Sequence, residues 1–278
     1  MTTTPPVPTV TPSIDAAPCP RVEILISPMP VDADTITITR AYGSQTDTVR
    51  GATGVVVAGD FVVVDYEAPF GVDVTYTCVT EDAGGIASSV SDPSTTVNLD
   101  VAEVWAQDPL DPSTSMPWAL NRDGASDARA KRPSFSGFKL SAPQNLAASI
   151  GSRLPIGQSG VRQAPSAMPL VIATTTPDST LTMLNLLTQA GALLCIRVPA
   201  AKLPLVDPLG YYQLGDITPD DTTVYGQVWW TTAATAIVGP SLDVIVPTRT
   251  LDDLGGEAST LADFGTLYAT LIDLERGV

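Results

Sequence analysis

The chain has 278 residues, with 14 basic and 30 acidic side chains and a net charge of −16. Nucleic acids and anionic membranes are bound by basic surfaces, so this balance argues against both as main partners. The chain contains no histidine, which removes Ser-His-Asp and Cys-His catalysis and His-ligated metal sites from consideration.

The first segment, residues 1–20, is rich in proline and threonine. Prolines favour extended conformations and contribute little to a hydrophobic core. The composition therefore predicts an extended or disordered arm, and we expect a neighbouring subunit to hold it in place.

The first ten residues lack the basic and apolar regions of a secretory signal, and no window reaches the roughly 20 apolar residues of a transmembrane helix. We therefore expect synthesis in a cytoplasm without export by a signal peptide.

Residues 21–100 are predicted to form an all-β domain. Short runs with apolar alternation, separated by Gly and Pro turns, are typical of a β-sandwich. We expect strands at 22–26, 35–40, 61–66 and 72–79, with a last strand near 86–90.

The late part of this domain carries a recognisable order of residues. Pro69-Phe70-Gly71 precedes an alternating strand with Tyr76 and Cys78, and the Gly84-Gly85 turn follows. This order resembles the late strands of fibronectin type III domains. Tyr76-Thr77-Cys78 also resembles the immunoglobulin pattern, but no early strand offers a partner cysteine. We therefore expect a sandwich without a disulfide, with Cys78 and Cys195 buried in apolar strands.

Residues 101–246 are predicted to form an α+β domain, a β-sheet layer covered by one helix. The expected strands begin at Val104-Trp105 and continue at 155–160, 168–174, 193–198, 211–217 and 223–232. A polar stretch from Asp108 to Asn121 separates the first strand from a basic run. The basic run consists of Arg122, Arg129, Lys131, Arg132 and Lys139. It is read either as a solvated loop or as a surface that docks on an acidic partner subunit.

The single predicted helix has signals at both ends. Thr176 can cap its N-terminus, Pro177 suits its first position and Asp178 favours its positive end. Gly191 is expected to close it. Its apolar side is predicted to consist of Leu181, Met183, Leu184, Leu187 and Ala190.

The last segment, residues 247–278, repeats the pattern T-L-x-D-[LF] every ten residues, starting at Thr250, Thr260 and Thr270. Threonine before an apolar segment with an early aspartate is typical of helix N-termini. We expect short helical segments with an apolar face. That face packs either on the same chain or on another copy or a neighbouring protein.

Candidate reactive groups are few. Seven carboxylates lie at predicted strand ends or turns, where aspartate is common for turn formation, so this role explains them better than catalysis does. They are Asp60, Asp65, Glu67 and Asp73 in the first domain and Asp216, Asp220 and Asp221 in the second. Asp32-Ala33-Asp34 is too short for a calcium loop, and Gly151, Gly157 and Gly160 lack the lysine of a phosphate loop. Trp229-Trp230 can pack in a core or interface, or one indole can stack on a sugar. We assign no catalytic, cofactor-binding or metal-binding residue.

Several segments together resemble a known family. They are Val49 to Ala52, Asp65 to Tyr76, Asp108 to Pro117, Arg153 to Ser166, Leu184 to Pro199 and Tyr211 to Ile217, followed by the terminal repeat. Their order and spacing resemble the minor tail proteins of long-tailed phages that infect actinobacteria. The repeats of that family often carry tryptophan where this chain has Leu251, Leu261 and Leu271.

This resemblance implies a structural virion protein at the tail tip or baseplate, next to hub and tape-measure proteins, with no catalytic residue and no cofactor. The second domain is expected to be similar to distal-tail and tail-tube folds. We expect a trimeric or hexameric ring of copies, with the second domain in the ring and the first domain outside it. A carbohydrate-binding adhesin that contacts the host surface through Trp118, Trp229 or Trp230 is the alternative. A cell-wall hydrolase is the weakest candidate.

Overall fold

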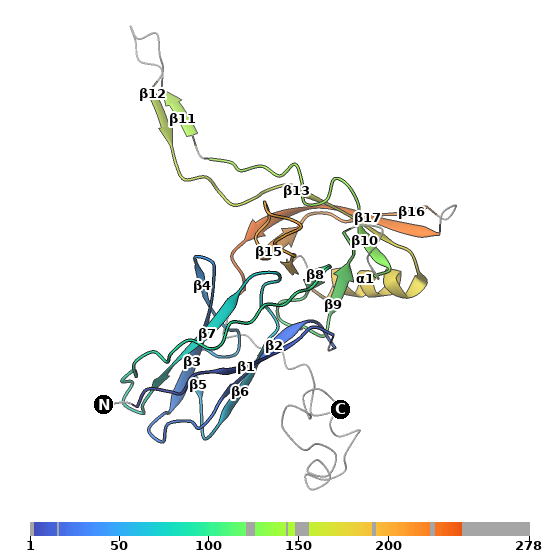
Figure 1. The fold of residues 1–278 in the computed structure, drawn as a ribbon. Coiled ribbons are helices and arrows are strands. Elements are labelled where there is room, and N and C mark those ends of the chain that lie inside the picture. Colours follow the sequence, from blue (N-terminus) through green and yellow to red (C-terminus); the bar gives the residue numbers. More distant parts are fainter. Residues whose placement is uncertain are drawn as a thin grey trace.

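The structure is a computed structural model that describes residues 3–15, 17–120, 126–142, 144–147, 156–190, 193–222 and 226–240. These residues are mainly β, with 17 strands and one helix. They form two bodies in contact, and a long hairpin projects from the second body (Figure 1). The predicted terminal helices at 247–278 lie outside the described residues.

The N-terminal body is a sandwich of two sheets. One sheet has the order β1-β2-β6 (Thr9–Ser13, Arg21–Ile26, Phe61–Asp65). In the other, β3 (Thr35–Tyr42) pairs along one edge with β7 (Val74–Glu81) and along the other with β4 (Gln45–Thr48) and β5 (Val55–Val56). Alternate residues of β2, β3 and β7 point between the sheets and form one hydrophobic cluster, so the period-2 patterns correctly predicted these strands.

The N-terminal arm differs from its prediction. Residues 9–13 form β1, which pairs antiparallel with β2 of the same chain, and Thr3 donates its backbone N–H to Asp32 at 2.9 Å. Pro12 is tolerated because β1 is an edge strand of its sheet. The extended conformation is therefore confirmed for residues 9–13, and the alternative of a disordered arm is wrong there. This segment is paired with β2 of the same chain and not with the neighbouring subunit that we expected to hold it.

The predicted last strand near 86–90 is replaced by a serine-lined segment, 88–97. Its residues Ser88, Ser91 and Ser94 donate backbone N–H groups to alternate carbonyls of β7, and their hydroxyls accept N–H groups of β7 in return. Bonded positions lie three residues apart in this segment and two residues apart in β7, so the pairing is not a β-ladder and the segment advances less per residue than a strand does. The edge of β7 is thereby covered.

The C-terminal body is a sheet that curls into a barrel. Its order is β10-β13-β17-β15-β14-β8-β9, and β16 (Thr218–Thr222) also pairs with β17. Ala119, just after β9, forms a parallel bridge with Arg129 of β10, so the two ends of the sheet meet. The bounds of the barrel strands are β8 Val104–Gln107, β9 Ser115–Trp118, β10 Ala128–Ala130, β13 Met168–Thr174, β14 Leu193–Arg197, β15 Leu209–Leu214 and β17 Gln227–Ile237.

Helix α1 (Pro177–Gln189) packs on β9 and β13 beside the barrel core. Its start agrees with the prediction: Thr176 and Ser179 form a reciprocal capping box, with Pro177 at the first position. The predicted apolar side is only partly correct, because Met183, Leu186 and Leu187 are buried whereas Leu181 and Leu184 are exposed. Gly191 lies outside the described residues, and Ala190 occupies the C-cap.

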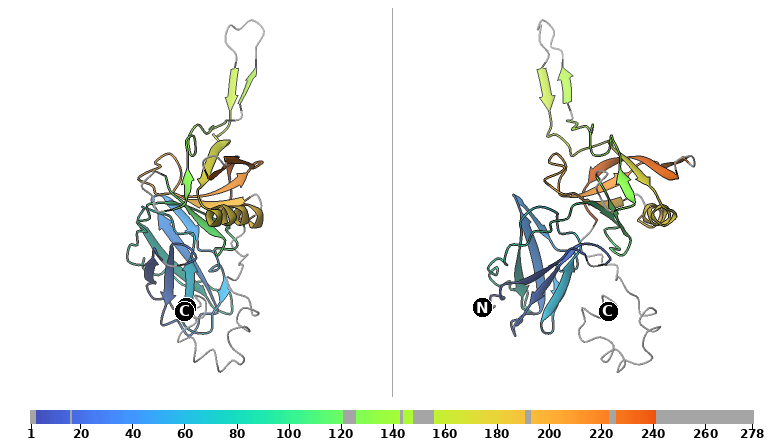
Figure 2. Two further views of the ribbon diagram at one scale, coloured as in Figure 1. Left: turned by 90° about the vertical axis from the view of Figure 1, so that its right-hand side faces the viewer. Right: turned by 45° about the vertical axis from the view of Figure 1, so that its right-hand side comes forward.

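Strands β11 (Gln144–Ala147) and β12 (Ile156–Ser159) form a separate two-stranded sheet, which we call the projecting hairpin. Both figures of the fold show it standing away from the barrel (Figures 1 and 2). It is joined to the barrel by two antiparallel segments, in which Lys139 and Ser166 form a bridge. The predicted strand at 155–160 is present as β12, which pairs with β11.

Candidate functional site

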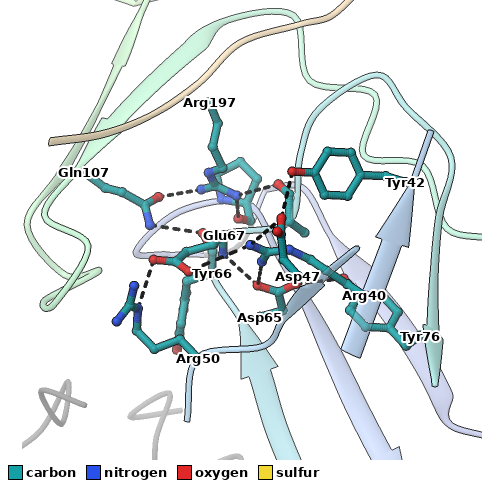
Figure 3. Close-up of polar contacts among 12 residues, drawn as sticks. Arg40, Tyr42, Asp47, Arg50, Asp65, Tyr66, Glu67, Tyr76, Gln107 and Arg197 are labelled. Carbon is teal, nitrogen blue, oxygen red and sulfur yellow. Dashed lines mark hydrogen bonds and ion pairs between the residues drawn. The ribbon is translucent and has the colours of Figure 1, made fainter. Parts of the chain in front are cut away.

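A cluster of buried polar side chains lies where the sandwich meets the barrel (Figure 3). Arg197, at the end of barrel strand β14, is fully buried. Its guanidinium donates to the carbonyls of Pro20 at 2.7 Å and Ala68 at 3.2 Å, both in the N-terminal body, and to Gln107 at 2.8 Å. It also lies 4.4 Å from the centroid of the Phe70 ring. One barrel side chain therefore contacts two separate segments of the N-terminal body, Pro20 and Ala68–Phe70.

The second cation of this cluster is Arg40, in sandwich strand β3. Its Nη1 donates to Asp65 Oδ1 at 2.8 Å, and both side chains are 1% exposed. Asp65 also accepts the N–H of Glu67 at 2.9 Å and the hydroxyl of Tyr76 at 3.0 Å. Both carboxylate oxygens of Asp65 are thus engaged, so this carboxylate is arranged as an acceptor within the fold and not as a free general base.

Glu67 extends the cluster toward the barrel. Its Oε1 accepts from Arg50 Nε at 3.0 Å, and its Oε2 lies 4.0 Å from Arg40 Nη2. Tyr211 of barrel strand β15 lies close enough to Glu67 for the charge of that carboxylate to help raise the pKa of its hydroxyl. Across the same boundary, Gln107 donates to the carbonyl of Tyr66 at 3.1 Å. We call this whole cluster the interdomain joint. It consists of Arg40, Arg50, Asp65, Glu67, Tyr76, Gln107, Arg197 and Tyr211.

Burial sets the ionisation of the joint. Burial alone would lower the pKa of Arg40, but the neighbouring carboxylates of Asp65 and Glu67 raise it well above its usual value, so the guanidinium stays charged. Burial, together with the charge of Asp65, raises the pKa of Tyr76. Burial also raises the pKa of Tyr211, with further contributions from Cys195 and Glu67. The tyrosines of the joint therefore stay neutral at ordinary pH.

A cleft of about 460 Å³ opens beside the joint, between the two bodies. Tyr42 and Asp47 line it from the sandwich, and Asp207, Tyr211 and Tyr212 line it from the barrel. The hydroxyl of Tyr42 donates to Gln45 or Asp47, at 2.8 and 2.9 Å. Burial raises the pKa of Tyr212 to about 12. The cleft walls are thus polar and aromatic, and their best-placed hydroxyl already has partners within the chain.

The carboxylates singled out in the sequence are dispersed. Asp65 and Glu67 meet in the joint, whereas Asp60 accepts from Ser27 at 2.7 Å and Asp73 from Asn98 at 2.9 Å, each near a turn. The remaining three lie elsewhere, with Asp216 exposed after β15, and Asp220 and Asp221 within β16. The structure therefore brings together one pair of these carboxylates, and arginines neutralise that pair.

The other candidate features do not form sites. Asp32 accepts from Thr3, which lowers its pKa, and the described residues contain no group of three or more potential metal ligands. Gly157 lies in β12, and Gly151 lies outside the described residues. The indoles of Trp118 and Trp230 are 1% and 6% exposed, so neither offers a platform for a sugar. Trp229 is half-buried, with Lys131 Nζ 5.9 Å from its ring centroid.

The basic run 122–139 lies partly in β10 and partly in the segment before the hairpin. Arg129 sits within β10, which corrects the expectation of a continuous solvated loop, and Lys131 contacts Trp229. Arg132 and Lys139 are exposed. Arg122 lies outside the described residues, so docking of the whole run on an acidic partner stays a prediction.

The cations of the joint were not identified from the sequence, although a signal for them exists. In β3, alternate residues on one face of the strand are all buried; they are Ile36, Ile38, Arg40 and Tyr42. An arginine at a position where the alternation predicts a buried apolar residue indicates a buried cation with a paired anion. Arg197 carries the same signal, since it ends a strand whose other residues are all apolar.

Alkaline pH is expected to destabilise the fold through the buried tyrosines. Their pKa values are raised in the folded state, so the stability they contribute is complete below the unfolded tyrosine pKa of about 10 and is lost as pH rises above it. Denaturant midpoints measured between pH 7 and pH 11 should fall most steeply above about pH 10. Burial also raises the pKa values of Cys19, Cys78 and Cys195, and these thiols add a shallower fall that begins nearer pH 9 in every variant. A Tyr211→Phe variant should show a shallower fall, and an equal fall in that variant would contradict the assignment.

Among the described residues, no helix has the length and apolar character needed to cross a lipid bilayer. Comparison of the chain with known protein families, with curated proteins and with solved structures finds no match in any of the three. The function must therefore be argued from the residues and from the geometry of the chain itself.

Proposed function

We propose that this chain is a structural minor tail protein of a phage virion, which assembles with further copies of itself at the tail tip beside other tail proteins. The order of segments that resembles actinobacterial phage tail proteins supports this proposal. We assign the N-terminal sandwich to a fibronectin type III-like fold and the barrel with its helix to a distal-tail-like fold. In this proposal the protein has no catalytic role and no cofactor.

The observation that carries the proposal is the projecting hairpin. A two-stranded hairpin is only marginally stable alone in water, and both of its outer edges present unpaired backbone groups. Within the described residues, β11 and β12 pair only with each other. Residues 144–159 contain a single charged side chain, Arg153, so they carry little of the edge charge that prevents association. Such an element is suited to contact with another protein.

The interdomain joint also supports a structural role. Two bodies joined by buried hydrogen bonds keep one relative orientation, which suits a part that must present fixed surfaces to its neighbours. Arg197 donates these hydrogen bonds from a fully buried position. Burial of Trp118 and Trp230 removes two of the three indoles on which the carbohydrate-binding alternative depended. No specific feature of the described residues favours that alternative.

Removal of the hairpin is expected to abolish self-association. The full chain should form a discrete trimer or hexamer by mass photometry at micromolar concentration. A variant with residues 143–160 replaced by a short Gly-Ser linker should remain monomeric, because the strand edges that would recruit another copy are gone. Its denaturant midpoint should stay within error of the wild type, since β11 and β12 pair with each other and with no other strand of the described residues. A wild-type chain that is monomeric at every concentration, alone and with candidate tail proteins, would contradict the proposal.

A further inference from the structure

Charge is unevenly divided along this chain. Between Asp127 and Asp178 lie 50 residues without an acidic side chain, and six of them are basic. Residues 1–100 show the opposite balance, with 13 acidic side chains and three arginines. In a protein whose net charge is −16, such segregation creates surfaces of opposite sign.

The positive surface is the stalk of the projecting hairpin, which consists of the two antiparallel segments 131–142 and 160–167. The exposed cations of these segments are Arg132, Lys139 and Arg162. Arg162 donates to the carbonyl of Leu140 at 3.1 Å, which holds it against the segment that carries Lys139. Among the described residues, no carboxylate forms an ion pair with these three cations. We call this surface the basic stalk.

Two carboxylates lie near the root of the stalk. Asp47 and Asp207 line the cleft between the two bodies, together with Ala164 and Pro165 of the stalk. The hydroxyl of Tyr42 lies 2.9 Å from Asp47. Both carboxylates line the cleft and pair with no cation of the stalk, so these cations remain available to a partner.

The negative surface is one end of the sandwich, where β2 and β7 end and β3 and β6 begin. The loop between β2 and β3 contacts both of the other strand ends. Met29 donates its backbone N–H to Asp60 at 3.3 Å. Asp34 donates its backbone N–H to the carbonyl of Glu81 at 2.8 Å. The exposed carboxylates of this end are Asp32, Asp34, Asp60 and Glu81. We call this surface the acidic tip.

The cations of the sandwich lie elsewhere. Arg21 and Arg40 are 2% and 1% exposed, and Arg50 is paired with Glu67. All three belong to the opposite end of the sandwich, which meets the barrel. Within the part of the chain that the structure describes, no ion pair reaches a carboxylate of the acidic tip. The acidic tip therefore carries negative side chains without a side-chain counter-ion.

The fold places the acidic tip and the basic stalk at opposite ends of the molecule. The interdomain joint occupies the other end of the sandwich, and the stalk leaves the barrel on the side away from the sandwich (Figures 1 and 2). Because the barrel stands between them, the stalk of one copy cannot reach its own tip. Two copies placed head to tail bring a stalk and a tip together.

The distribution of charge favours a second copy as the partner of the stalk. Two copies with a net charge of −16 repel each other overall, so they associate best where local charges are opposite. Nucleic acid is also negative, but its binding neutralises many phosphates, and the stalk has three exposed cations on an acidic protein. The acidic tip is present wherever copies of this chain gather.

We propose that the basic stalk of one copy docks on the acidic tip of the next copy. Different surfaces meet at each contact, and such a head-to-tail contact closes into a ring when its rotation allows. The stalk continues into the projecting hairpin, whose strand edges add affinity, since exposed charge pairs mainly orient a contact. This inference rests on the proposed self-assembling role and names the surfaces that orient it.

The test reverses the charge of one surface at a time in the full chain. The stalk variant carries Lys139→Glu and Arg162→Glu, the tip variant carries Asp34→Lys and Glu81→Lys, and the swap variant carries all four changes. The matched control carries Asp15→Lys and Asp100→Lys, which alter two exposed carboxylates at the barrel end of the sandwich. Mass photometry measures assembly, and circular dichroism confirms that each variant is folded.

We expect the stalk and tip variants each to associate roughly tenfold or more weakly than the wild type, because like charges then oppose each other at the contact. The control should assemble like the wild type. The swap variant should regain assembly, since its charges are complementary again, and added substitutions would not rescue a damaged fold. Wild-type association should also weaken from about 0.1 M to about 0.5 M NaCl.

Two kinds of result would overturn this docking and leave the proposed function standing. One is normal assembly of the tip variant, with or without loss in the stalk variant, or a folded swap variant that stays monomeric. The other is binding of a fluorescent DNA duplex by the wild type that the stalk variant loses, which would identify nucleic acid as the partner. A wild type that is monomeric at every concentration would instead overturn the proposed function itself.

Discussion

Replacement of Arg197 with alanine is expected to lower the free energy of unfolding by about 3–5 kcal/mol and to uncouple the two bodies. The guanidinium makes three hydrogen bonds from a fully buried position, and two of them reach carbonyls of the sandwich. Without it, the carbonyls of Pro20 and Ala68 and the amide oxygen of Gln107 lose a partner away from water. The stacking of the cation on Phe70 is lost as well.

Chemical denaturation followed by tryptophan fluorescence and by circular dichroism measures this effect. The wild type should unfold in one transition with both probes, whereas Arg197→Ala should show two resolved transitions. Arg197→Lys should restore little of the lost stability, because an ammonium group cannot donate hydrogen bonds in the fixed planar arrangement of a guanidinium. Arg162→Ala is the control, since that side chain is exposed, and it should change stability by less than about 0.5 kcal/mol. A single transition shifted by less than about 1 kcal/mol in Arg197→Ala would contradict this account of the joint.

The second large effect is expected for Arg40→Met, which should lower the free energy of unfolding by about 3–5 kcal/mol. The substitution preserves much of the side-chain volume but leaves the carboxylates of Asp65 and Glu67 buried near β3 without this counter-ion. The cost arises from the unpaired charge and not from lost packing. The loss of stability in Arg40→Met should therefore exceed that in Ile38→Val, which is about 1 kcal/mol. Ile38 is the neighbouring buried position of the same strand, and its change to valine is conservative.

A double-mutant cycle separates these contributions. Asp65→Asn removes the negative charge but keeps an acceptor for the N–H of Glu67. In the double variant with Arg40→Met and Asp65→Asn, no unpaired charge remains at this pair. The loss of unfolding free energy in the double variant should therefore be smaller than the sum of the two single losses, by more than about 1 kcal/mol for groups in contact. Additive costs would show that Arg40 and Asp65 do not stabilise each other.

Local patterns were sufficient to predict the strands that build the two cores. Thr35 to Arg40 alternates between apolar and polar residues, Val22 to Ile26 is a mostly aliphatic run, and β3 and β2 contain them. The start of α1 was equally predictable, because Thr176 and Pro177 act through their own backbone and side-chain chemistry. These features depend on neighbours in the sequence, so the sequence alone determines them.

Other elements depend on contacts that local patterns do not encode. Strands β1, β9 and β16 each contain a proline, namely Pro12, Pro117 and Pro219. Because proline is rare inside strands, the sequence pattern predicts a turn or an extended arm at these positions. They become strands because a partner strand lies beside them. The exposure of Leu181 and Leu184 likewise follows from where the barrel places α1 and not from helical periodicity alone. The joint was missed because Arg40 and Arg197 are buried against the general preference of charged residues for the surface.

The hydrogen bond from Arg197 to Pro20 spans 177 residues of sequence, and this separation fixes an order of events during synthesis. A ribosome that adds about 5–20 residues per second delivers residue 197 roughly 10–35 seconds after residue 20. During that interval the sandwich has its strands but not the cation that binds Pro20 and Ala68. The hydrogen bonds from Arg197 to the sandwich can therefore form only after residue 197 has been synthesised.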